Sequence, residues 1–251
     1  MNADRQKIKH AIIALGAMFL IMSVGSPAAA SKKLILPKHK GIIVLDPGHG
    51  GNDTGTQSAD GIDEKAVTLN MAHMIAKQLK DDYNVVLTRT DDYWLDIPSR
   101  TAVANHMKSG LFISLHAGGS FLHSAGGNSV FYYESPYDGS LTVQKPDLDP
   151  LADTDSPSSW NHLQEKYLSN SRKLAEIIQS QILKITQDPD SNIQGAALVV
   201  LKGADMPAIL IELGYLTNPN ESKALVDPDF LALMADAISK GIKAFLSKKS
   251  K

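Results

Sequence analysis

The sequence of 251 residues predicts a single α/β domain with a central mixed, mostly parallel sheet of about six strands and helices on both faces. Two observations carry this prediction. From residue 40 onward, short runs of consecutive apolar residues alternate with longer segments in which apolar residues recur at helical spacing. Strands that are apolar on every residue are typical of parallel sheets, because helices cover both faces. Neither an internal repeat nor a linker to a second domain interrupts residues 41–246.

The expected strands are apolar runs that end at turn residues or at a polar side chain. The first run, IIVL, stops at Asp46-Pro47-Gly48, which is typical of a turn. In chain order, we expect strands over residues 42–45, 85–88, 111–115, 129–133, 197–201 and 208–212.

The expected helices keep apolar residues three and four positions apart. Pro98 is compatible with the first turn of the second helix, where no backbone N–H is needed. We expect helices over residues 64–79, 97–107, 163–185 and 230–246. The segment 137–159 has no periodicity and is rich in Pro, Asp and Ser, so we expect a long surface loop or lid there. A basic tail over residues 247–251 follows the last helix.

The N-terminal residues have the pattern of a secretory signal peptide. Three basic residues precede an apolar run of about fifteen residues, and three consecutive alanines end at Ala30. That run is shorter than the roughly twenty residues that span a bilayer as a helix. We therefore expect a signal peptide over residues 1–30, cleaved after Ala30, and a short linker over 31–40. The alternative is an uncleaved signal anchor. After cleavage, the protein would be exported to the periplasm or secreted, with no stable membrane anchor.

The composition narrows the chemistry that the protein can perform. Its 25 Lys and Arg against 27 Asp and Glu give a formal net charge of −2. Removal of residues 1–30 takes away three basic residues and one acidic residue, which leaves −4. Because there is no basic excess, we expect no nucleic-acid partner. The absence of Cys excludes thiol nucleophiles, disulfides and Cys-ligated metals, so any metal must be held by His, Asp and Glu.

Four polar residues stand near the expected carboxyl ends of strands, where the working residues of open α/β sheets gather. His49 follows the first expected strand, and His116 ends a central one. Glu212 ends a late strand, and Glu64 opens the first long helix. Two imidazoles and a carboxylate suit a catalytic zinc with an open position for water, which would leave Glu212 free as a general base. Each residue alone has an ordinary explanation, as a turn residue, a first-turn acid or a strand-end side chain; their joint occurrence favours a metal site.

Five motifs follow one another along the chain: IIVLDPGHGGNDTG (42–55), DEKAVTLNMA (63–72), VVLTRTDDYWLDIPSRTAVAN (85–105), LFISLHAG (111–118) and MPAILIELGYLTNPNE (206–221). Together they resemble, in order and in register, the zinc-dependent N-acetylmuramoyl-L-alanine amidases of bacterial cell walls, the amidase-3 type. The resemblance covers nearly all of residues 41–246.

The resemblance implies a phosphorylase/hydrolase-like domain that hydrolyses the amide bond between N-acetylmuramic acid and the L-alanine of the peptidoglycan stem peptide. His49, Glu64 and His116 fall where the family's zinc ligands lie. Glu212 falls where its catalytic glutamate lies. The resemblance thus implies Zn²⁺ as the cofactor and peptidoglycan as the substrate, with an activator protein as a candidate partner. We expect a monomer.

Two features depart from the family pattern. Gly118 occupies the place of the Asn in the family motif SLHAN, which is expected to loosen the substrate-binding loop or the support of His116. The segment 137–159 lies where some relatives carry an inhibitory helix. It is too rich in Pro for a long helix, so we do not expect helix-type autoinhibition.

Two other functions remain open at this point. A zinc peptidase would act on the stem peptide and would need a cationic clamp for a carboxylate, a role left to Arg89 or Arg100. A degenerate member of the family would bind peptidoglycan without cleaving it or regulate another hydrolase, and would be expected to have a broken ligand set.

Several other residues have more than one interpretation. Trp94 and Trp160 can stack on a sugar or a peptide, although a packing anchor is the commoner role of a single Trp in a loop. We expect Arg89 and Arg100 to form structural ion pairs with the neighbouring aspartates. His73, inside the first helix, is expected to be a packed or surface residue.

Overall fold

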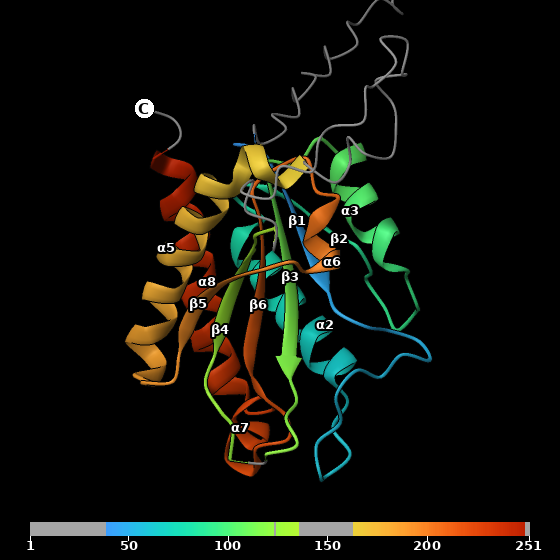
Figure 1. Cartoon of the computed structure of the whole chain (residues 1–251), viewed down its shortest axis with the longest axis vertical. Coiled ribbons are helices and arrows are strands. Elements are labelled where there is room, and N and C mark those ends of the chain that lie inside the picture. The colour runs from blue at the N-terminus through green and yellow to red at the C-terminus, as the bar shows by residue number, and fades with distance from the viewer. Residues whose placement is uncertain (1–38, 123, 136–162, 249–251) are drawn as a thin grey trace, which may run out of the picture. The chain divides into compact units, whose positions relative to one another are not determined.

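The computed structural model describes residues 39–122, 124–135 and 163–248, which fold around one six-stranded sheet (Figure 1). The strands are β1 (Ile42–Pro47), β2 (Asn84–Leu87), β3 (Leu111–Gly118), β4 (Ser129–Tyr133), β5 (Asn192–Ala196) and β6 (Ala208–Tyr215). They lie in the order β2-β1-β3-β6-β4-β5. Neighbouring strands of this sheet are parallel, except for β4 and β6, which are antiparallel. The predicted mixed, mostly parallel sheet is confirmed.

The centre of the sheet is formed by β1, β3 and β6, whose apolar runs are buried on both faces. The register pairs Leu45 with Ile113 and Ile113 with Ile209. Because these three strands are parallel, their carboxyl ends lie at one edge of the sheet. The residues that follow or end these strands are therefore brought to a common place.

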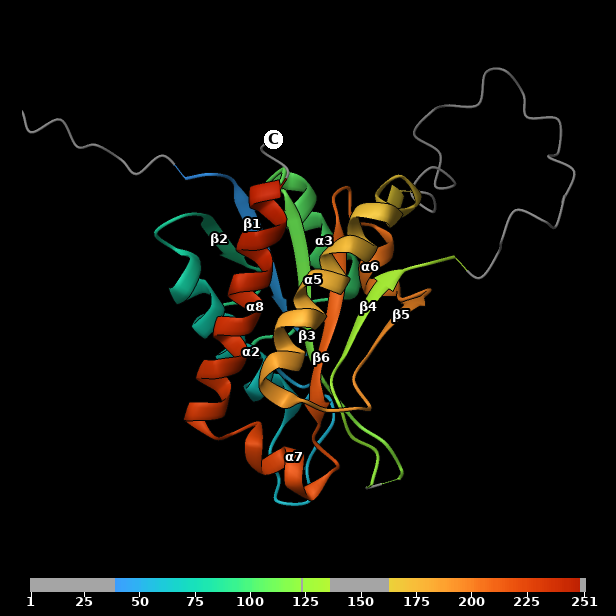
Figure 2. The same cartoon turned by 90° about the vertical axis from the view of Figure 1, so that its left-hand side faces the viewer.

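Three long helices cover one face of the sheet, namely α2 (Glu64–Leu79), α5 (Leu168–Thr186) and α8 (Pro228–Lys248). Figure 2 shows α5 and α8 side by side in front of the strands. The apolar sides of the three helices bury the larger core, which includes Met71, Leu174 and Ile238. A short 3₁₀ helix, η1 (Leu163–Tyr167), leads into α5. The helices predicted for these segments are confirmed.

The opposite face carries a smaller core under two helices, α3 (Ile97–His106) and α6 (Val199–Lys202). Phe112 of β3 packs in this core with Leu201 of α6. Asp96 caps the start of α3, where its carboxylate accepts a hydrogen bond from the N–H of Ser99 at 2.7 Å. One further helix, α7 (Pro219–Ala224), follows β6. Helices thus lie on both faces, as predicted.

The strand expected over residues 197–201 is wrong. This segment instead enters α6, in which Leu201 is buried and Val199 is exposed. The sheet still has six strands, because β5, which was not predicted, pairs with β4 at the edge of the sheet. The first three residues of β5 are exposed, so this strand lacks the apolar run that marks a central strand. A short apolar run such as ALVVL fits one helical turn as well as a strand, and periodicity alone does not separate the two.

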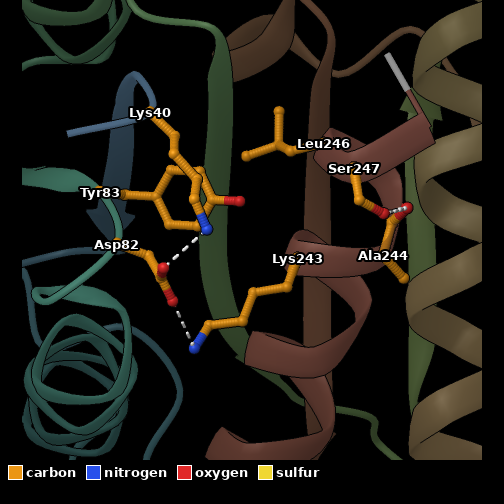
Figure 3. A pocket seen from close by; sticks show the side chains of 7 residues that line it. All are labelled: Lys40, Asp82, Tyr83, Lys243, Ala244, Leu246 and Ser247. Carbon is orange, nitrogen blue, oxygen red and sulfur yellow. Dashed lines mark hydrogen bonds and ion pairs between the residues drawn. The ribbon is translucent and has the colours of Figure 1, made fainter. Parts of the chain in front are cut away.

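An ion-pair network lies near the amino ends of β1 and β2 and reaches the last turns of α8. The carboxylate of Asp82 accepts from Lys40 at 2.7 Å and from Lys243 at 3.1 Å (Figure 3). The ammonium of Lys40 also lies 5.9 Å from the centre of the Tyr83 ring. These residues line a hollow of about 750 Å³. Because Asp82 pairs with both lysines, the network joins α8 to the turn after α2; its exposure to solvent keeps its contribution to stability small.

Several predicted segments lie outside the described residues. They are the signal peptide over 1–30, most of the linker over 31–40, and the loop or lid over 137–159. The last helix continues through Lys248 and so takes in the first residues of the expected basic tail. Within the part of the chain that the structure describes, no helix is both long enough and apolar enough to cross a membrane.

Candidate metal centre and general base

The loop after β1 brings His49 to the edge of the sheet beside His116 of β3. The N–H of Gly48 donates to the carbonyl of Leu115 at 2.9 Å, so the loop stays against β3 at its start. The two imidazole rings have centres 5.0 Å apart. A Cβ on Gly48 would lie 2.5 Å from Cε1 of His116, far inside normal contact. Glycine at this position therefore allows the His116 ring to pack directly against the loop backbone.

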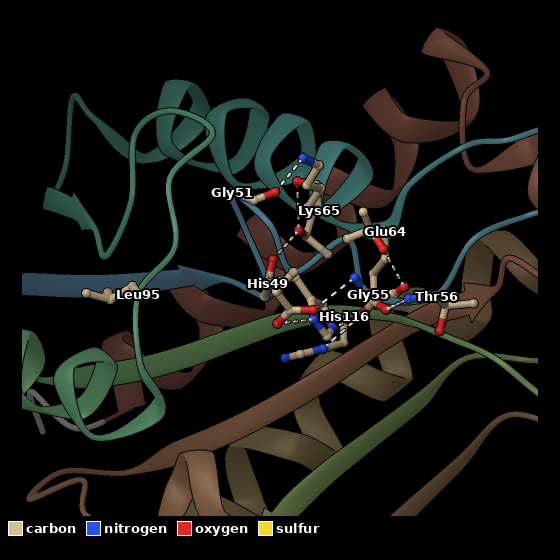
Figure 4. A network of polar contacts seen from close by, with 12 residues as sticks. His49, Gly51, Gly55, Thr56, Glu64, Lys65, Leu95 and His116 are labelled. Carbon is tan, nitrogen blue, oxygen red and sulfur yellow. Dashed lines mark hydrogen bonds and ion pairs between the residues drawn. The ribbon is translucent and has the colours of Figure 1, made fainter.

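The carboxylate of Glu64 lies between the two imidazoles (Figure 4). Its Oε1 is 3.1 Å from Nε2 of His49 and 2.9 Å from Nδ1 of His116. Two backbone N–H groups also donate to Glu64, from Ala117 to Oε1 at 3.0 Å and from Thr56 to Oε2 at 2.8 Å. Burial opposes ionisation of Glu64, but hydrogen bonds and charges from the two histidines outweigh it and lower its pKa well below the ordinary value.

The other ring nitrogen of His49 also meets a carboxylate. Its Nδ1 is 2.9 Å from Oδ2 of Asp53, which leaves Nε2 directed at Glu64. Burial lowers the pKa of His49, yet Glu64 and Asp53 together raise it above the ordinary value. A carboxylate on the outer nitrogen fixes the orientation of an imidazole and increases its basicity. Asp53 therefore fixes the orientation of the His49 ring, with Nε2 directed at Glu64.

This donor set fits a metal ion. One ligand atom from each of His49, Glu64 and His116 can be chosen so that all three lie within 4.8 Å of one another. Among the residues that the structure describes, one group of at least three His, Asp or Glu side chains could hold a metal ion, and it is this one. Two imidazoles and one carboxylate are ligands that zinc accepts in catalytic sites, with a fourth position left for water or substrate. The structure thus brings together the three residues that were predicted as ligands.

Glu212 of β6 lies opposite His116 in the register between β3 and β6. Its Oε2 is enclosed by protein and has no hydrogen-bond partner among the described residues. Burial, reinforced by the nearby charge of Glu64 and opposed by the two imidazoles, raises the pKa of Glu212 to about 7. A carboxyl group with this pKa can take up and release a proton near neutral pH.

Residues 43–244 match the family described as N-acetylmuramoyl-L-alanine amidase, Amidase_3. The chain belongs to this family. Amidase AmiC of Neisseria meningitidis serogroup B is 30% identical over 221 residues, which cover 82% of this chain and 53% of that protein. Amidase AmiA of Escherichia coli K12 is 31% identical over 220 residues, which cover 82% of this chain and 76% of that protein. This chain thus spans about half the length of the Neisseria relative.

A solved relative shares the fold of this Amidase_3 chain. The catalytic domain of CwlV, an N-acetylmuramoyl-L-alanine amidase from Bacillus (Paenibacillus) polymyxa var. colistinus, has a TM-score of 0.67 and 28% identity. The likeness covers 82% of this chain and 98% of that domain. The α/β architecture described above is therefore that of an amidase catalytic domain.

Two buried arginines hold the loop after β1 in this Amidase_3 chain. Both donate to the carbonyl of Pro47, Arg89 at 3.0 Å and Arg100 at 2.8 Å. Arg89 also donates to the carbonyl of Gly48 at 2.8 Å, and Arg100 to that of His49 at 2.9 Å. Their guanidinium groups are thus engaged with the protein itself, which leaves neither of them as the free cationic clamp that a zinc carboxypeptidase needs.

Asp46 supports the site and was missed in the sequence. Its buried carboxylate accepts hydrogen bonds from Arg100 at 2.9 Å, from Thr88 at 2.5 Å and from Ser114 at 2.7 Å. The expected ion pairs of Arg100 with the aspartates around it in sequence do not form, because Asp46 takes that role. The sequence offered one signal for this role, because Asp46 directly follows the apolar run of the first strand. A carboxylate buried at such a place needs hydrogen-bond or charged partners.

The departure at Gly118 lies beside the general-base candidate. A Cβ on Gly118 would lie 3.4 Å from Oε2 of Glu212, an ordinary contact. The carbonyl of Gly118 accepts from the N–H of Leu216 at 2.9 Å, which joins the chain beyond β6 to β3. The glycine therefore affects the immediate surroundings of Glu212.

The remaining predicted residues lie in different environments. His73 is on α2, with Nε2 3.3 Å from the carbonyl of Thr90, and is not part of the cluster of candidate metal ligands. Trp94 is 61% exposed, so the packing-anchor interpretation is wrong for it. Trp160 lies outside the described residues.

Proposed function

We propose that this protein is a zinc-dependent N-acetylmuramoyl-L-alanine amidase. It would hydrolyse the amide bond between the lactyl group of N-acetylmuramic acid and the L-alanine of the stem peptide in peptidoglycan. The observation that carries this proposal is the cluster of His49, Glu64 and His116, whose ligand atoms lie within 4.8 Å of one another. Membership of the Amidase_3 family and the names of the relatives support the substrate and the bond.

In this proposal, His49, Glu64 and His116 hold one zinc ion. When bound, zinc supplies Lewis acidity, which polarises a carbonyl and lowers the pKa of water to about 7. The protein's part is orientation: Asp53 fixes the ring of His49, and two backbone N–H groups fix the carboxylate of Glu64. Such outer contacts set the geometry and basicity of the ligands.

We assign the general base to Glu212. Its Oε2 has no hydrogen-bond partner in the described part of the chain, and its pKa is about 7. It can therefore accept a proton from the attacking water and deliver it to the nitrogen of the leaving L-alanine. The water oxygen first bonds to the carbonyl carbon, and the C–N bond then breaks as its nitrogen takes up the proton. The products are N-acetylmuramic acid with a free lactyl carboxyl group and a stem peptide with a free amino terminus. Since water attacks directly, no covalent acyl-enzyme is required, in agreement with the absence of Cys.

The two alternative functions have less support. A zinc carboxypeptidase would require a cationic clamp, but Arg89 and Arg100 donate to backbone carbonyls and to Asp46. A non-catalytic peptidoglycan binder would be expected to have lost a ligand or the base, but all four side chains are present. We therefore place hydrolysis of the muramoyl amide first.

We further propose that the protein acts outside the cytoplasm after removal of residues 1–30. The support is the basic, apolar and small-residue pattern of that segment, together with a cell-wall substrate. Whether an activator protein is needed is tested by assaying the purified protein alone and then with extracts of the cell envelope.

The experiment that tests this function is product analysis on a defined muropeptide. Zinc-loaded protein is incubated with a disaccharide bearing a tetrapeptide, and the products are identified by mass spectrometry. We expect intact tetrapeptide with N-terminal L-alanine and the peptide-free disaccharide. Release of single amino acids, with the peptide still attached to sugar, would instead establish a peptidase.

A further inference from the structure

A groove beside the candidate metal centre is lined both by His49 and His116 and by Leu198 and Val199 at the start of α6. Its cavity has a volume of about 530 Å³, within the usual range for small-ligand sites. Three exposed apolar side chains line it: Trp94 is 61% exposed, Ile97 46% and Val199 66%. We call this feature the Trp94 groove. Apolar side chains that face solvent together, next to a candidate catalytic centre, indicate a surface that a ligand covers.

Trp94 is held firmly on the side that precedes it in the chain. The carboxylate of Asp92 accepts from the N–H of Gly51 at 2.7 Å. The ammonium of Lys65 bridges the same two residues, at 2.8 Å from the Asp92 carboxylate and 2.8 Å from the Gly51 carbonyl. A Cβ on Gly51 would lie 2.7 Å from the backbone nitrogen of Trp94, so the two loops are in direct contact.

Trp94 is held on the other side by Arg100. One nitrogen of this guanidinium, Nη2, donates both to the carbonyl of His49 at 2.9 Å and to the carbonyl of Leu95 at 3.0 Å. The loop that carries the exposed indole is thus tied, before and after Trp94, to the loop that carries a metal-ligand candidate. An exposed Trp that is fixed in this way can serve as a platform at a set place relative to the reacting bond.

We propose that the Trp94 groove binds the glycan strand on the muramoyl side of the scissile amide, with a pyranose ring stacked on Trp94. The proposal rests on the amidase function proposed above and adds which half of the substrate lies on which side of the site. One face of a pyranose ring consists of C–H groups, which pack well on an aromatic surface. The apolar side chains of Ile97 and Val199 suit the methyl groups of the N-acetyl substituents.

Apart from the zinc ion proposed at His49 and His116, the charges along the groove favour the glycan over the stem peptide. Asp53 and Asp96 line the groove, whereas its Arg100 is buried and paired with Asp46. The glycan strand is uncharged where its lactyl groups are in amide linkage, and its hydroxyl groups can donate to carboxylates. The stem peptide carries several carboxylates of its own, which these aspartates would repel.

A neighbouring hollow extends the surface next to the Trp94 groove. A second hollow, of about 500 Å³, lies between α3 and α6 and shares Ile97, Pro98 and Val199 with the first. Lys202 lines this second hollow. Two hollows in series give a path that continues beyond one sugar ring, as a strand of repeating disaccharides needs.

Tryptophan fluorescence tests the proposal directly, because the sequence has two Trp residues. With Trp160→Phe, Trp94 becomes the sole emitter. The variant also carries Glu212→Gln so that it binds without cleaving, and it is loaded with zinc. The probe is a GlcNAc–MurNAc tetrasaccharide whose lactyl groups are capped as methylamides, which keeps it uncharged. We expect saturable binding, with a shift of emission to shorter wavelength and weaker quenching by acrylamide. Free stem peptide at the same concentration should leave the emission unchanged.

Calorimetry on single variants of the zinc-loaded protein completes the test. We expect Trp94→Ala to weaken tetrasaccharide binding about tenfold or more, Val199→Ser to weaken it less, and Trp94→Phe to restore most of it. Leu233→Ala is the matched control, since this apolar side chain is 53% exposed but lies on α8. Circular dichroism checks that each variant is folded.

The outcomes separate the two proposals. An unchanged emission with the tetrasaccharide, or equal affinity in Trp94→Ala and the parent, would overturn the glycan assignment. An emission shift caused by the stem peptide alone would overturn it too and would move the peptide into the groove. If the parent binds the tetrasaccharide through Trp94 yet cleaves no muramoyl–alanine amide, only the proposed amidase function fails.

Discussion

Replacing Gly48 by alanine tests whether the His116 ring depends on the space that this glycine leaves. The new Cβ would lie 2.5, 2.7 and 2.8 Å from three atoms of the ring. Ordinary contacts of this kind begin at about 3.4 Å, so the ring must move by up to about 0.9 Å to relieve the overlap. Gly48 is not among the residues with positive φ, so alanine adds no backbone strain of its own. A displacement of about 1 Å exceeds the tolerance of about 0.5 Å for a working site and costs about a hundredfold in rate.

We therefore expect Gly48→Ala to bind zinc about ten- to a hundredfold more weakly and to release stem peptides from sacculi about a hundredfold more slowly. Zinc affinity is measured by competition with a chelating dye, and release by chromatography. Gly110→Ala is the control, since the nearest atom to its new Cβ would be the carbonyl oxygen of Ile42 at 3.6 Å. Full zinc affinity together with full activity in Gly48→Ala would refute the reasoning.

Three further predictions concern a ligand, a support and the base. His116→Ala is expected to lose bound zinc in elemental analysis, whereas His73→Ala keeps it; equal zinc in both would exclude His116 as a ligand. Asp46→Asn weakens the buried pair with Arg100 and is expected to lower the free energy of unfolding by about 3 kcal/mol in urea titrations, and a loss below about 1 kcal/mol would contradict that role. In zinc-free protein, the pKa of Glu212 is about 7 when folded, against 4.5 for an ordinary glutamate, so the folded state binds its proton more tightly than the unfolded state. As the pH rises from 4.5 to about 7, the free energy of unfolding of the parent should therefore fall by about 3 kcal/mol relative to that of Glu212→Gln. If the difference in unfolding free energy between the two proteins does not change with pH, the raised pKa of Glu212 is contradicted.

The centre of the fold could be predicted from the sequence because burial on both faces leaves a plain pattern. The strands around Leu45, Ile113 and Ile209 are apolar on successive residues, and few other structures give such runs between helical segments. The edge strand β5 could not be found in this way, since its first residues face solvent. The run over residues 197–201, which is apolar like a strand, instead places Leu201 in the core through one helical turn.

The side chains of the candidate site could be predicted from the sequence, but the contacts that hold them in place could not. Parallel strands place their carboxyl ends together, so His49, His116 and Glu212 could be expected to meet. The pairing of Arg100 with Asp46 joins residues 54 positions apart and follows from no local periodicity. The exposure of Trp94 likewise depends on contacts between two loops that are distant in sequence.

The measurement that tests the central claim most directly is peptide release from purified sacculi by zinc-loaded protein, compared between the parent and Glu212→Gln. Glu176→Gln, the same change at an exposed position of α5, is the control. We predict that the parent and the control release stem peptides with N-terminal L-alanine, whereas Glu212→Gln retains its zinc and releases at least about a hundredfold less. Full release by Glu212→Gln, or no release of such peptides by the parent, would contradict the account.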